Sequence, residues 1–488
     1  MRGHRFFPFF LSFFLCNALW AQKSSKILHY LHKMDSSNSF RQASWGFCLL
    51  NGQTGKTLAQ FQSEKSLVPA SVQKILTTSA ALALLGDTFR FHTSLYGVGT
   101  LDKNGTLRGG LCIEGKGNPV LGSVKGSAQD YKSIVQTFAT QVKTRGIKQI
   151  TGKLVADVTY FEQEPIPSSW IWYDIGNYYA PEISALNLAE NQYELFFKPG
   201  KKEGDSTDFL YTNPIIPGLR LVNHTTTAKG GGDQTYIPGP PRAMEKHIYG
   251  KMPLGDSFKV KGAIPQPELF FLYLLKEELI RQGIRMDSVN LCVQRKGEAP
   301  CLDPKASQTL YFRHSSPTLL DICRYANQTS NNISSECLLR TLGAQIGKEG
   351  STNEGIQTVR DFLGSRIQNL RSLKMTDGSG MSKYNLCSPL QMAQLLSSIQ
   401  KEKWFASFFS TLPISGKGGT MEKMGDGTKA EGKVVAKSGT MERIKCYAGY
   451  VKASNGLLHP FAIFVNHHDV PNGEILRWIE GLMELCVE

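Results

Sequence analysis

The sequence LVPASVQKILTTSAALALLG, residues 67–86, places a serine one helical turn before a lysine. Residues i and i+3 of a helix share a face, so the Ser71 hydroxyl and the Lys74 amine would meet. A neutral lysine can remove the serine proton and create a nucleophile, and burial favours the neutral form. The alternative is an ordinary polar start to a buried helix. A second Ser-x-x-Lys, Ser398 to Lys401, runs into charged residues and is typical of a solvated helix end.

Two further motifs supply groups that such chemistry needs. The sequence QTSNNISSE places Ser330 and Asn332 in a turn before a predicted helix, although Ser-x-Asn is common by chance. The sequence VVAKSGTM ends an apolar strand with a cation, two hydroxyls and a glycine: Lys437, Ser438, Gly439 and Thr440. Alone, that segment is a strand that turns at its glycine. The three motifs in this order are the set found in penicillin-binding proteins and serine β-lactamases, and together they predict catalysis.

The surrounding pattern predicts the elements that must hold these motifs. Residues 45–63 are predicted as two strands around a turn, and the final 60 residues as strands followed by a helix. Helical patterns follow Pro69 and resume at about residue 315. From Phe89 to about Leu310, short β-like runs alternate with glycine and proline, interrupted by one strong helix, PELFFLYLLKEELIRQG.

The spacing of the motifs predicts an insertion. Ser71 and Ser330 are 259 residues apart, whereas a compact β-lactamase needs only a short helical segment in that gap. We therefore expect a catalytic domain split into residues 24–88 and 312–488. The β-rich region between them, residues 89–311, has room for two domains.

The chain resembles the low-molecular-mass class C penicillin-binding proteins, the exported D-alanyl-D-alanine carboxypeptidase/endopeptidases. Four further segments carry this resemblance, which covers nearly the whole mature chain: GKGNPVLGS, WIWYDIGNYYAPEISALNLAENQ, TDGSGMSKYNLCSP and LPISGKGGTM. It implies an α/β fold in which a β-lactamase/transpeptidase-like antiparallel sheet with helices is interrupted by the β-rich insertion. Ser-Asn-Asn replaces the family's Ser-Asp-Asn, Ser438 replaces a threonine and GNP replaces GDP. The first two changes keep the needed amide and hydroxyl.

The resemblance implies a role for each motif residue. Ser71 would attack the D-Ala-D-Ala carbonyl and form an acyl-enzyme, with Lys74 as its base, and water would then release the product. Ser330 would relay a proton to the leaving group alongside Lys437, and Asn332 would hold the substrate amide.

The strand motif would contact the substrate's end. Ser438, Gly439 and Thr440 lie where the family binds the terminal carboxylate. The backbone N–H groups of Ser71 and Thr440 would form the oxyanion hole.

Three more positions match a family pocket for the free amino-acid end of the stem peptide. Asp174 would bind an ammonium there, and Tyr179 would line the pocket; a turn residue and simple packing are the alternatives. Lys383 stands where relatives often carry an arginine that grips a carboxylate, but lysine lacks the bidentate fork. Gly378 and Gly380 need only be turn glycines.

Composition limits location and partners. Arg2, Arg5 and the apolar run FFPFFLSFFLCNALW predict a cleaved export signal over residues 1–21, and hence a periplasmic or cell-wall location. The formal charge of +14 favours anionic wall polymers, with at most peripheral membrane association. Nucleic acid is disfavoured because no Lys/Arg cluster alternates with aromatics.

No Cys-x-x-Cys occurs in the sequence, and neither a metal nor an organic cofactor is expected. Cys292 and Cys301 are closest in sequence, but pairing stays open.

The sequence thus predicts a serine D-alanyl-D-alanine carboxypeptidase or endopeptidase acting on peptidoglycan stem peptides or their cross-links. β-Lactams should inhibit it covalently at Ser71. One alternative is a β-lactamase, which the long gap disfavours. An alternative of another class is an inactive wall-binding scaffold, which the intact motif residues disfavour.

Overall fold

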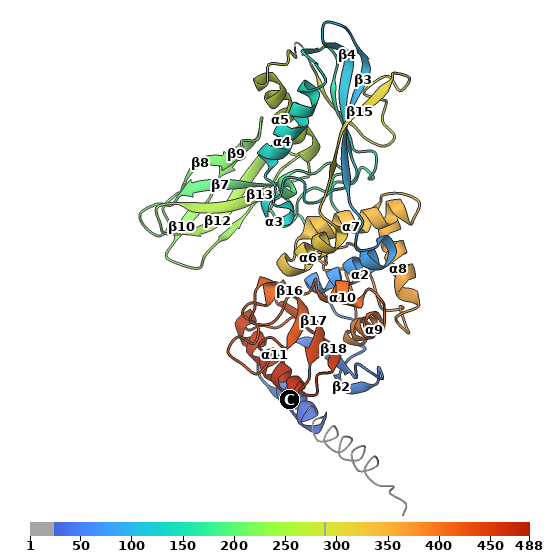
Figure 1. Ribbon diagram of the computed structural model, residues 1–488. Coiled ribbons are helices and arrows are strands. Elements are labelled where there is room, and N and C mark those ends of the chain that lie inside the picture. The colour runs from blue at the N-terminus through green and yellow to red at the C-terminus, as the bar shows by residue number, and fades with distance from the viewer. Residues whose placement is uncertain (1–23, 287–288) are drawn as a thin grey trace, which may run out of the picture.

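Figure 1 shows the computed structural model, which describes residues 24–286 and 289–488. The predicted export signal, residues 1–21, lies outside the described residues. Within those two ranges, no helix is long and apolar enough to cross a membrane. The chain forms a five-stranded sheet at one end, a layer of helices beside it, and an inserted region of further sheets at the other end.

The five-stranded sheet joins the two ends of the described chain. Its order is β16-β17-β18-β1-β2, and neighbouring strands are antiparallel. The strands are β1 (Ser44–Leu50), β2 (Thr57–Phe61), β16 (Val434–Met441), β17 (Ile444–Lys452) and β18 (Leu458–Asn466). All five fall in segments that the sequence predicts as strands.

Both faces of this sheet are covered, because side chains alternate along each strand. In β18, Phe461 and Ile463 pack against α11 (Asn472–Val487) and a helix over residues 24–36, whereas Phe464 packs against the helical layer. That layer contains η1 (Ala70–Gln73), α2 (Lys74–Leu85), α6 (Leu319–Thr329), α7 (Asn332–Gln345), α8 (Thr352–Gly364), α9 (Pro389–Ile399) and α10 (Phe405–Phe409). The short η3 (Gly419–Met421) precedes β16. The predicted antiparallel sheet with helices is confirmed.

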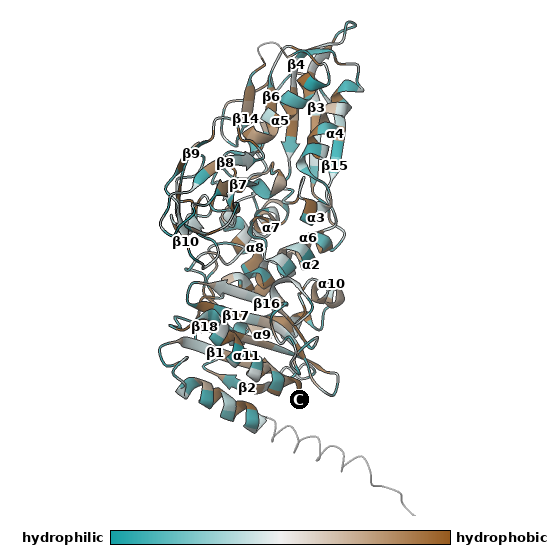
Figure 2. Ribbon diagram, turned by 90° about the vertical axis from the view of Figure 1, so that its left-hand side faces the viewer, coloured by the Kyte–Doolittle hydropathy of each residue, from teal (hydrophilic) through white to brown (hydrophobic). Residues whose placement is uncertain are grey.

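The inserted region contains a six-stranded mixed sheet of order β14-β6-β4-β3-β15, with β5 paired to β4. The strands are β3 (His92–Leu101), β4 (Thr106–Gly115), β5 (Gln149–Ile150), β6 (Leu154–Asp157), β14 (Leu291–Gln294) and β15 (Gln308–Ser315). Figure 2 shows hydrophobic stretches along β3 and β4, and α4 (Tyr131–Lys143) and α5 (Pro267–Arg281) share their core. Because β15 pairs with β3 as far as Ser315, the inserted sheet extends past the expected boundary at residue 311.

A second group of strands projects from the side of the molecule (Figure 1). One sheet has the order β13-β7-β8, and in another β12 pairs with β9, β10 and β11. The strands are β7 (Gln192–Lys198), β8 (Asp208–Asn213), β9 (Arg220–Asn223), β10 (Thr226–Ala228), β11 (Gln234–Tyr236), β12 (Glu245–Pro253) and β13 (Phe258–Ala263). Two short turns, α3 (Val124–Ser127) and η2 (Ala189–Asn191), contact α6.

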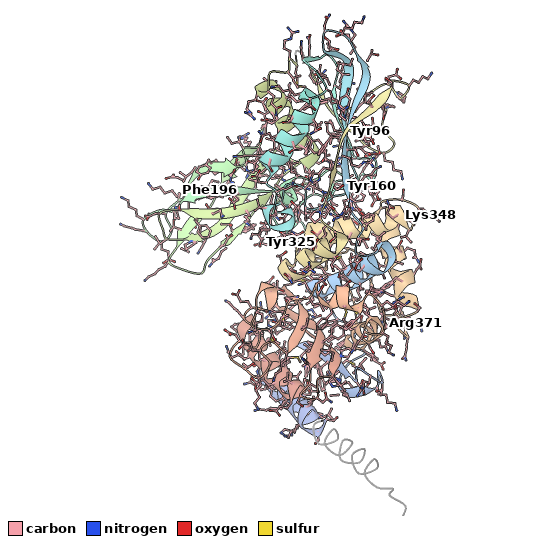
Figure 3. All side chains as sticks on the ribbon, in the orientation of Figure 1. Tyr96, Tyr160, Phe196, Tyr325, Lys348 and Arg371 are labelled. Carbon is pink, nitrogen blue, oxygen red and sulfur yellow. A yellow bond between two sulfur atoms is a disulfide. The ribbon has the colours of Figure 1, made fainter. Side chains whose placement is uncertain are left out.

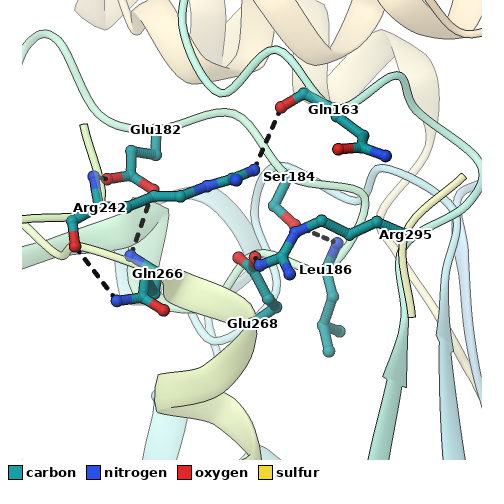
Figure 4. A network of polar contacts seen from close by, with 8 residues as sticks. All are labelled: Gln163, Glu182, Ser184, Leu186, Arg242, Gln266, Glu268 and Arg295. Carbon is teal, nitrogen blue, oxygen red and sulfur yellow. Dashed lines mark hydrogen bonds and ion pairs between the residues drawn. The ribbon is translucent and has the colours of Figure 1, made fainter. Parts of the chain in front are cut away.

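A polar network holds the loop before η2 against these strands (Figure 4). Glu182 accepts hydrogen bonds from the backbone N–H groups of Arg242 and Gln266. The Gln266 side chain donates to the Arg242 carbonyl at 3.1 Å. Beside them, Arg295 and Glu268 form a largely buried ion pair of 2.7 Å. Each of these two buried carboxylates therefore has a hydrogen-bond or ion-pair partner.

A disulfide joins Cys292 and Cys301. These are the two cysteines closest in sequence, although the sequence left their pairing open. The disulfide ties β14 to the loop before β15.

Candidate active site

Ser71 lies in a sharp turn between Pro69 and α2. Ala70 has a φ of +47°, a region that residues with a Cβ seldom adopt. Lys74 is the first residue of α2, one turn after the serine. Its Nζ lies 3.0 Å from Ser71 Oγ. The structure therefore brings together the two groups that the first motif predicts as nucleophile and base.

Lys74 is fully buried among acceptors. Its Nζ also donates to Asn332 Oδ1 and to the Ser379 carbonyl, each at 2.7 Å. Burial lowers the pKa of Lys74 from 10.5 to about 7, although the carboxylates of Asp377 and Glu336 act in the opposite direction. A substantial fraction of this amine is neutral near neutral pH, so it can accept the serine proton.

The Ser-x-Asn motif forms the turn between α6 and α7. Ser330 ends α6 with a φ of +60° and is half-buried. Asn331 caps α7 by accepting from the Ser334 backbone N–H at 2.9 Å. The Asn332 side-chain oxygen accepts a hydrogen bond from Lys74. Within the described residues, the Ser330 hydroxyl borders this site without a hydrogen bond to the lysine.

The third motif lies on β16, beside the turn that carries the nucleophile. Lys437 is fully buried and donates to the Ser438 carbonyl at 2.6 Å. Burial and the nearby charge of Lys74 hold the pKa of Lys437 well below its usual value. A Cβ at Gly439 would lie 2.7 Å from the Pro69 carbonyl oxygen. Only glycine therefore lets β16 approach the nucleophile this closely.

The end of β16 presents a hydroxyl beside a cation. Thr440 is exposed, and its Oγ1 accepts a hydrogen bond from Lys445 Nζ at 2.9 Å. Burial lowers the pKa of Lys445. A hydroxyl and an ammonium at one strand end suit a carboxylate ligand.

A loop after residue 376 forms the back of the site. Asp377 accepts hydrogen bonds of 2.7–3.0 Å from four donors: Gly380, Ser382, Asn385 and Trp170. Gly380 has a φ of +82°, and a Cβ there would lie 1.9 Å from the Ala70 carbonyl oxygen. This glycine thus serves the close approach of the loop to the Ser71 turn, beyond the turn role predicted for it.

Glu336 on α7 fixes the same loop from the other side. Its fully buried carboxylate accepts from the backbone N–H of Gly378 at 3.1 Å and of Ser379 at 2.8 Å. These bonds orient the peptide whose carbonyl accepts from Lys74. Burial and the charge of Asp377 raise the pKa of Glu336.

The inserted region reaches this site through Tyr179. Its hydroxyl donates to Asp174 Oδ1 at 3.1 Å, and its backbone carbonyl accepts from Asn332 Nδ2 at 2.7 Å. Burial raises the pKa of Asp174, opposed by the tyrosine hydrogen bond and by the charge of exposed Lys383. The structure therefore places Tyr179 against the Ser-x-Asn turn, with Asp174 bonded to its hydroxyl and Lys383 near that carboxylate.

Comparison with known proteins decides the class. A family model described as D-Ala-D-Ala carboxypeptidase 3 (S13) matches residues 29–478. The chain belongs to this S13 family. It is a serine-type D-alanyl-D-alanine peptidase, and the family, fold class and enzyme class that the sequence predicts are confirmed.

Individual relatives support the assignment of this chain to the S13 family. The D-alanyl-D-alanine carboxypeptidase of Actinomadura sp. (strain R39) is 28% identical over 442 residues, 87% of this chain and 78% of that protein. D-alanyl-D-alanine carboxypeptidase DacB of Haemophilus influenzae is 25% identical over 429 residues, 86% and 85% of the two chains. The crystal structure of penicillin binding protein 4 from H. influenzae has the same fold, with a TM-score of 0.78, 21% identity and coverage of 95% and 99%.

Three residues of the site in this S13 peptidase were not predicted from its sequence: Glu336, Asp377 and Lys445. A signal existed for the first, because it stands in a predicted helix four positions after Asn332, and residues i and i+4 share a helix face. The second stands in the DGSG segment, where attention fell on the glycines. Nothing in the spacing of Lys445 indicates that β17 carries it back to Thr440.

Proposed function

We propose that this S13 peptidase hydrolyses the D-Ala-D-Ala amide of peptidoglycan stem peptides, their cross-links, or both, through an acyl-enzyme on Ser71. The observation that carries the proposal is the 3.0 Å contact between Ser71 Oγ and the buried Lys74 amine, whose pKa is about 7. The relatives, which are D-alanyl-D-alanine carboxypeptidases, support the substrate class.

The groups around Ser71 suit each step. Lys74 takes the hydroxyl proton as Oγ attacks the substrate carbonyl. The backbone N–H groups of Ser71 and Thr440 stabilise the oxyanion, and one such donor is typically worth about 3–4 kcal/mol. The proton then passes through Ser330, alongside Lys437, to the leaving nitrogen as the C–N bond breaks. Water hydrolyses the resulting ester and restores the serine.

The substrate backbone lies along β16. Asn332 holds its amide, and the strand Ser438, Gly439, Thr440 receives the terminal carboxylate, with Lys445 adding a positive charge beside the threonine hydroxyl.

The free amino end of the stem peptide lies in the inserted region. The Asp174 carboxylate binds its ammonium, Tyr179 orients that carboxylate, and Lys383 binds a neighbouring carboxylate of the substrate. The 3.1 Å bond between the tyrosine hydroxyl and Asp174 supports this arrangement.

The same proposal covers inhibitors, location and domains. β-Lactams acylate Ser71, because their strained amide mimics the substrate; a related H. influenzae structure contains a bound β-lactam. The protein acts outside the cytoplasmic membrane, where peptidoglycan is. Residues 24–88 and 312–488 form one split catalytic domain around the inserted residues 89–311, with β15 completing the inserted sheet.

Intact-protein mass spectrometry after incubation with penicillin tests the proposal. Wild type should gain one adduct that maps to Ser71, and Ser71→Ala should gain none. Ser398→Ala, which alters the other Ser-x-x-Lys, is the matched control and should react like wild type. Consumption of penicillin without a lasting adduct would favour a β-lactamase. Intact penicillin without an adduct would favour an inactive scaffold.

A further inference from the structure

A hollow opens beside the Ser-x-Asn turn, between α6 and the inserted region. Ser330 and Asn332 form one wall, and Tyr179 forms another. Two lysines complete it, Lys125 on α3 and Lys261 on β13. Neither the proposed nucleophile nor the proposed carboxylate strand β16 lines it, so this hollow adjoins the site of acyl transfer at Ser330 and Asn332 and extends away from Ser71.

The hollow carries unpaired positive charge. Lys125 is exposed, and Lys261 is half-buried with its Nζ 5.8 Å from the centre of the Tyr178 ring. Among the ion pairs of the described residues, neither lysine has a partner. Two ammonium groups on one concave surface favour a ligand that bears carboxylates.

The single carboxylate in the hollow is already occupied. Glu190 Oε1 accepts from Ser123 at 2.5 Å and Tyr325 at 2.8 Å, and Oε2 accepts from Asn331 at 2.5 Å. Figure 3 shows Tyr325 where the helical layer meets the inserted region. Glu190 and both its neighbours in η2 have φ between +52° and +57°, a strained run that fixes this carboxylate against the turn. It therefore leaves the two lysines free for a ligand.

The position of the hollow decides which part of a substrate it suits. It begins at Ser330, the group that the proposed mechanism places beside the leaving nitrogen. Asp174, which would hold the ammonium of the acyl donor, bonds to Tyr179 but does not line the hollow. Tyr179 thus stands between the unpaired lysines of the hollow and the Asp174 carboxylate, so the two regions suit different peptide ends.

We propose that this hollow binds the second, carboxylate-bearing stem peptide that leaves when a peptidoglycan cross-link is cut, with Lys125 and Lys261 contacting its carboxylates. This inference rests on the proposed function and deepens it. A single stem releases only D-alanine and places nothing in the hollow. The two lysines therefore determine preference for cross-linked substrate and take no part in acylation.

The test compares a purified cross-linked muropeptide dimer with a single pentapeptide muropeptide. In the variant Lys125→Ala/Lys261→Ala, the ratio of kcat/KM for the dimer to that for the single stem should fall about five- to tenfold, as expected for loss of two partly exposed charge contacts. Lys125→Arg/Lys261→Arg should restore most of the ratio. Lys251→Ala, which removes an exposed lysine of β12, is the matched control and should leave the ratio unchanged.

The outcomes distinguish failure of this inference from failure of the proposed function. A ratio unchanged in the double alanine variant would overturn the inference, as would an equal loss on both substrates. Wild type that cleaves the single stem but not the dimer would also overturn it and leave the proposed function standing. Wild type that cleaves neither substrate would refute the proposed function and the inference with it.

Discussion

The side-chain amide of Asn332 donates to the backbone carbonyl of Tyr179 at 2.7 Å while its oxygen accepts from the Lys74 amine at 2.7 Å. One side chain thus joins the proposed base, which belongs to the helical layer, to a loop of the inserted region. Because an amide has a donor and an acceptor at fixed separation, a shift of that loop moves the proposed base. The inserted region is therefore part of the catalytic geometry, although its strands are far from Ser71 in sequence.

The proposed base sets the pH dependence of acylation. Lys74 accepts the serine proton only when it is neutral, which requires a pH above its pKa of about 7. Acylation by penicillin should therefore rise with pH and reach half its maximum near that value. Quenched-flow mass spectrometry over a range of about pH 5 to 9 measures this rise, the acid limb of the pH–rate curve. An acid limb with its midpoint near pH 10, where an exposed lysine titrates at about that pH, would show that burial does not activate the amine.

Two substitutions at Asn332 separate its two roles. Asn332→Ala removes a hydrogen bond to a charged group, so acylation should slow by about 2 kcal/mol, or roughly thirtyfold. Asn332→Asp keeps an acceptor for Lys74 but adds a negative charge, which raises the pKa of the lysine. The acid limb should then move to higher pH. An unmoved limb in Asn332→Asp would contradict the contact between these two side chains.

The tyrosine hydroxyl should matter for peptides and not for penicillin. Tyr179→Phe leaves the backbone carbonyl that Asn332 uses but removes the donor to Asp174. We expect KM for a stem peptide with a free amino end to rise severalfold, while penicillin acylation and hydrolysis of the N-acetylated peptide stay unchanged. Tyr96→Phe, far along β3 (Figure 3), is the matched control. A loss on all substrates would place this hydroxyl in the general architecture of the site.

Much of the fold could be predicted because each strand and helix carries its own periodicity. The alternation in β18 and the capped pattern of α5 are local signals. α4 was missed although Ile134, Phe138 and Val142 recur every four residues and Asp130 caps its start. Its many exposed polar residues hid that stripe among the β-like runs around it. The order of the inserted strands could not be predicted, since parallel pairing of β4 with β6 and of β6 with β14 depends on distant segments.

The candidate site likewise contains residues that the sequence predicts and residues that it does not. Ser71 and Lys74 are one turn apart, so local spacing suffices, and the other motifs carry recognisable residue types. Glu336 acts through backbone N–H groups, which every residue has, so no residue pattern marks its partners. Asp377 also accepts from the Trp170 side chain, which is 207 residues away in sequence. Their contribution becomes visible only when α7 packs against the loop after residue 376.

Glu336→Gln tests whether this buried carboxylate supports the proposed base through both geometry and charge. Its oxygens accept from Gly378 and Ser379, and its negative charge raises the pKa of Lys74. Glutamine keeps one acceptor but turns an NH₂ group toward a backbone donor. The peptide that carries the Ser379 carbonyl should then be less firmly oriented toward Lys74. Acylation should slow.

The pH profile distinguishes the two effects. Of the charged groups near Lys74, Glu336 and Asp377 raise its pKa, buried Lys437 is adjacent, and Arg340 lies one turn from the glutamate on α7. Loss of one negative charge should lower the pKa of Lys74, so the acid limb of acylation should move to lower pH. A slower rate with an unmoved limb would show that the glutamate acts by geometry alone. Glu431→Gln, which neutralises a partly exposed carboxylate paired with Lys417, is the matched control and should change neither the rate nor the pH dependence of acylation.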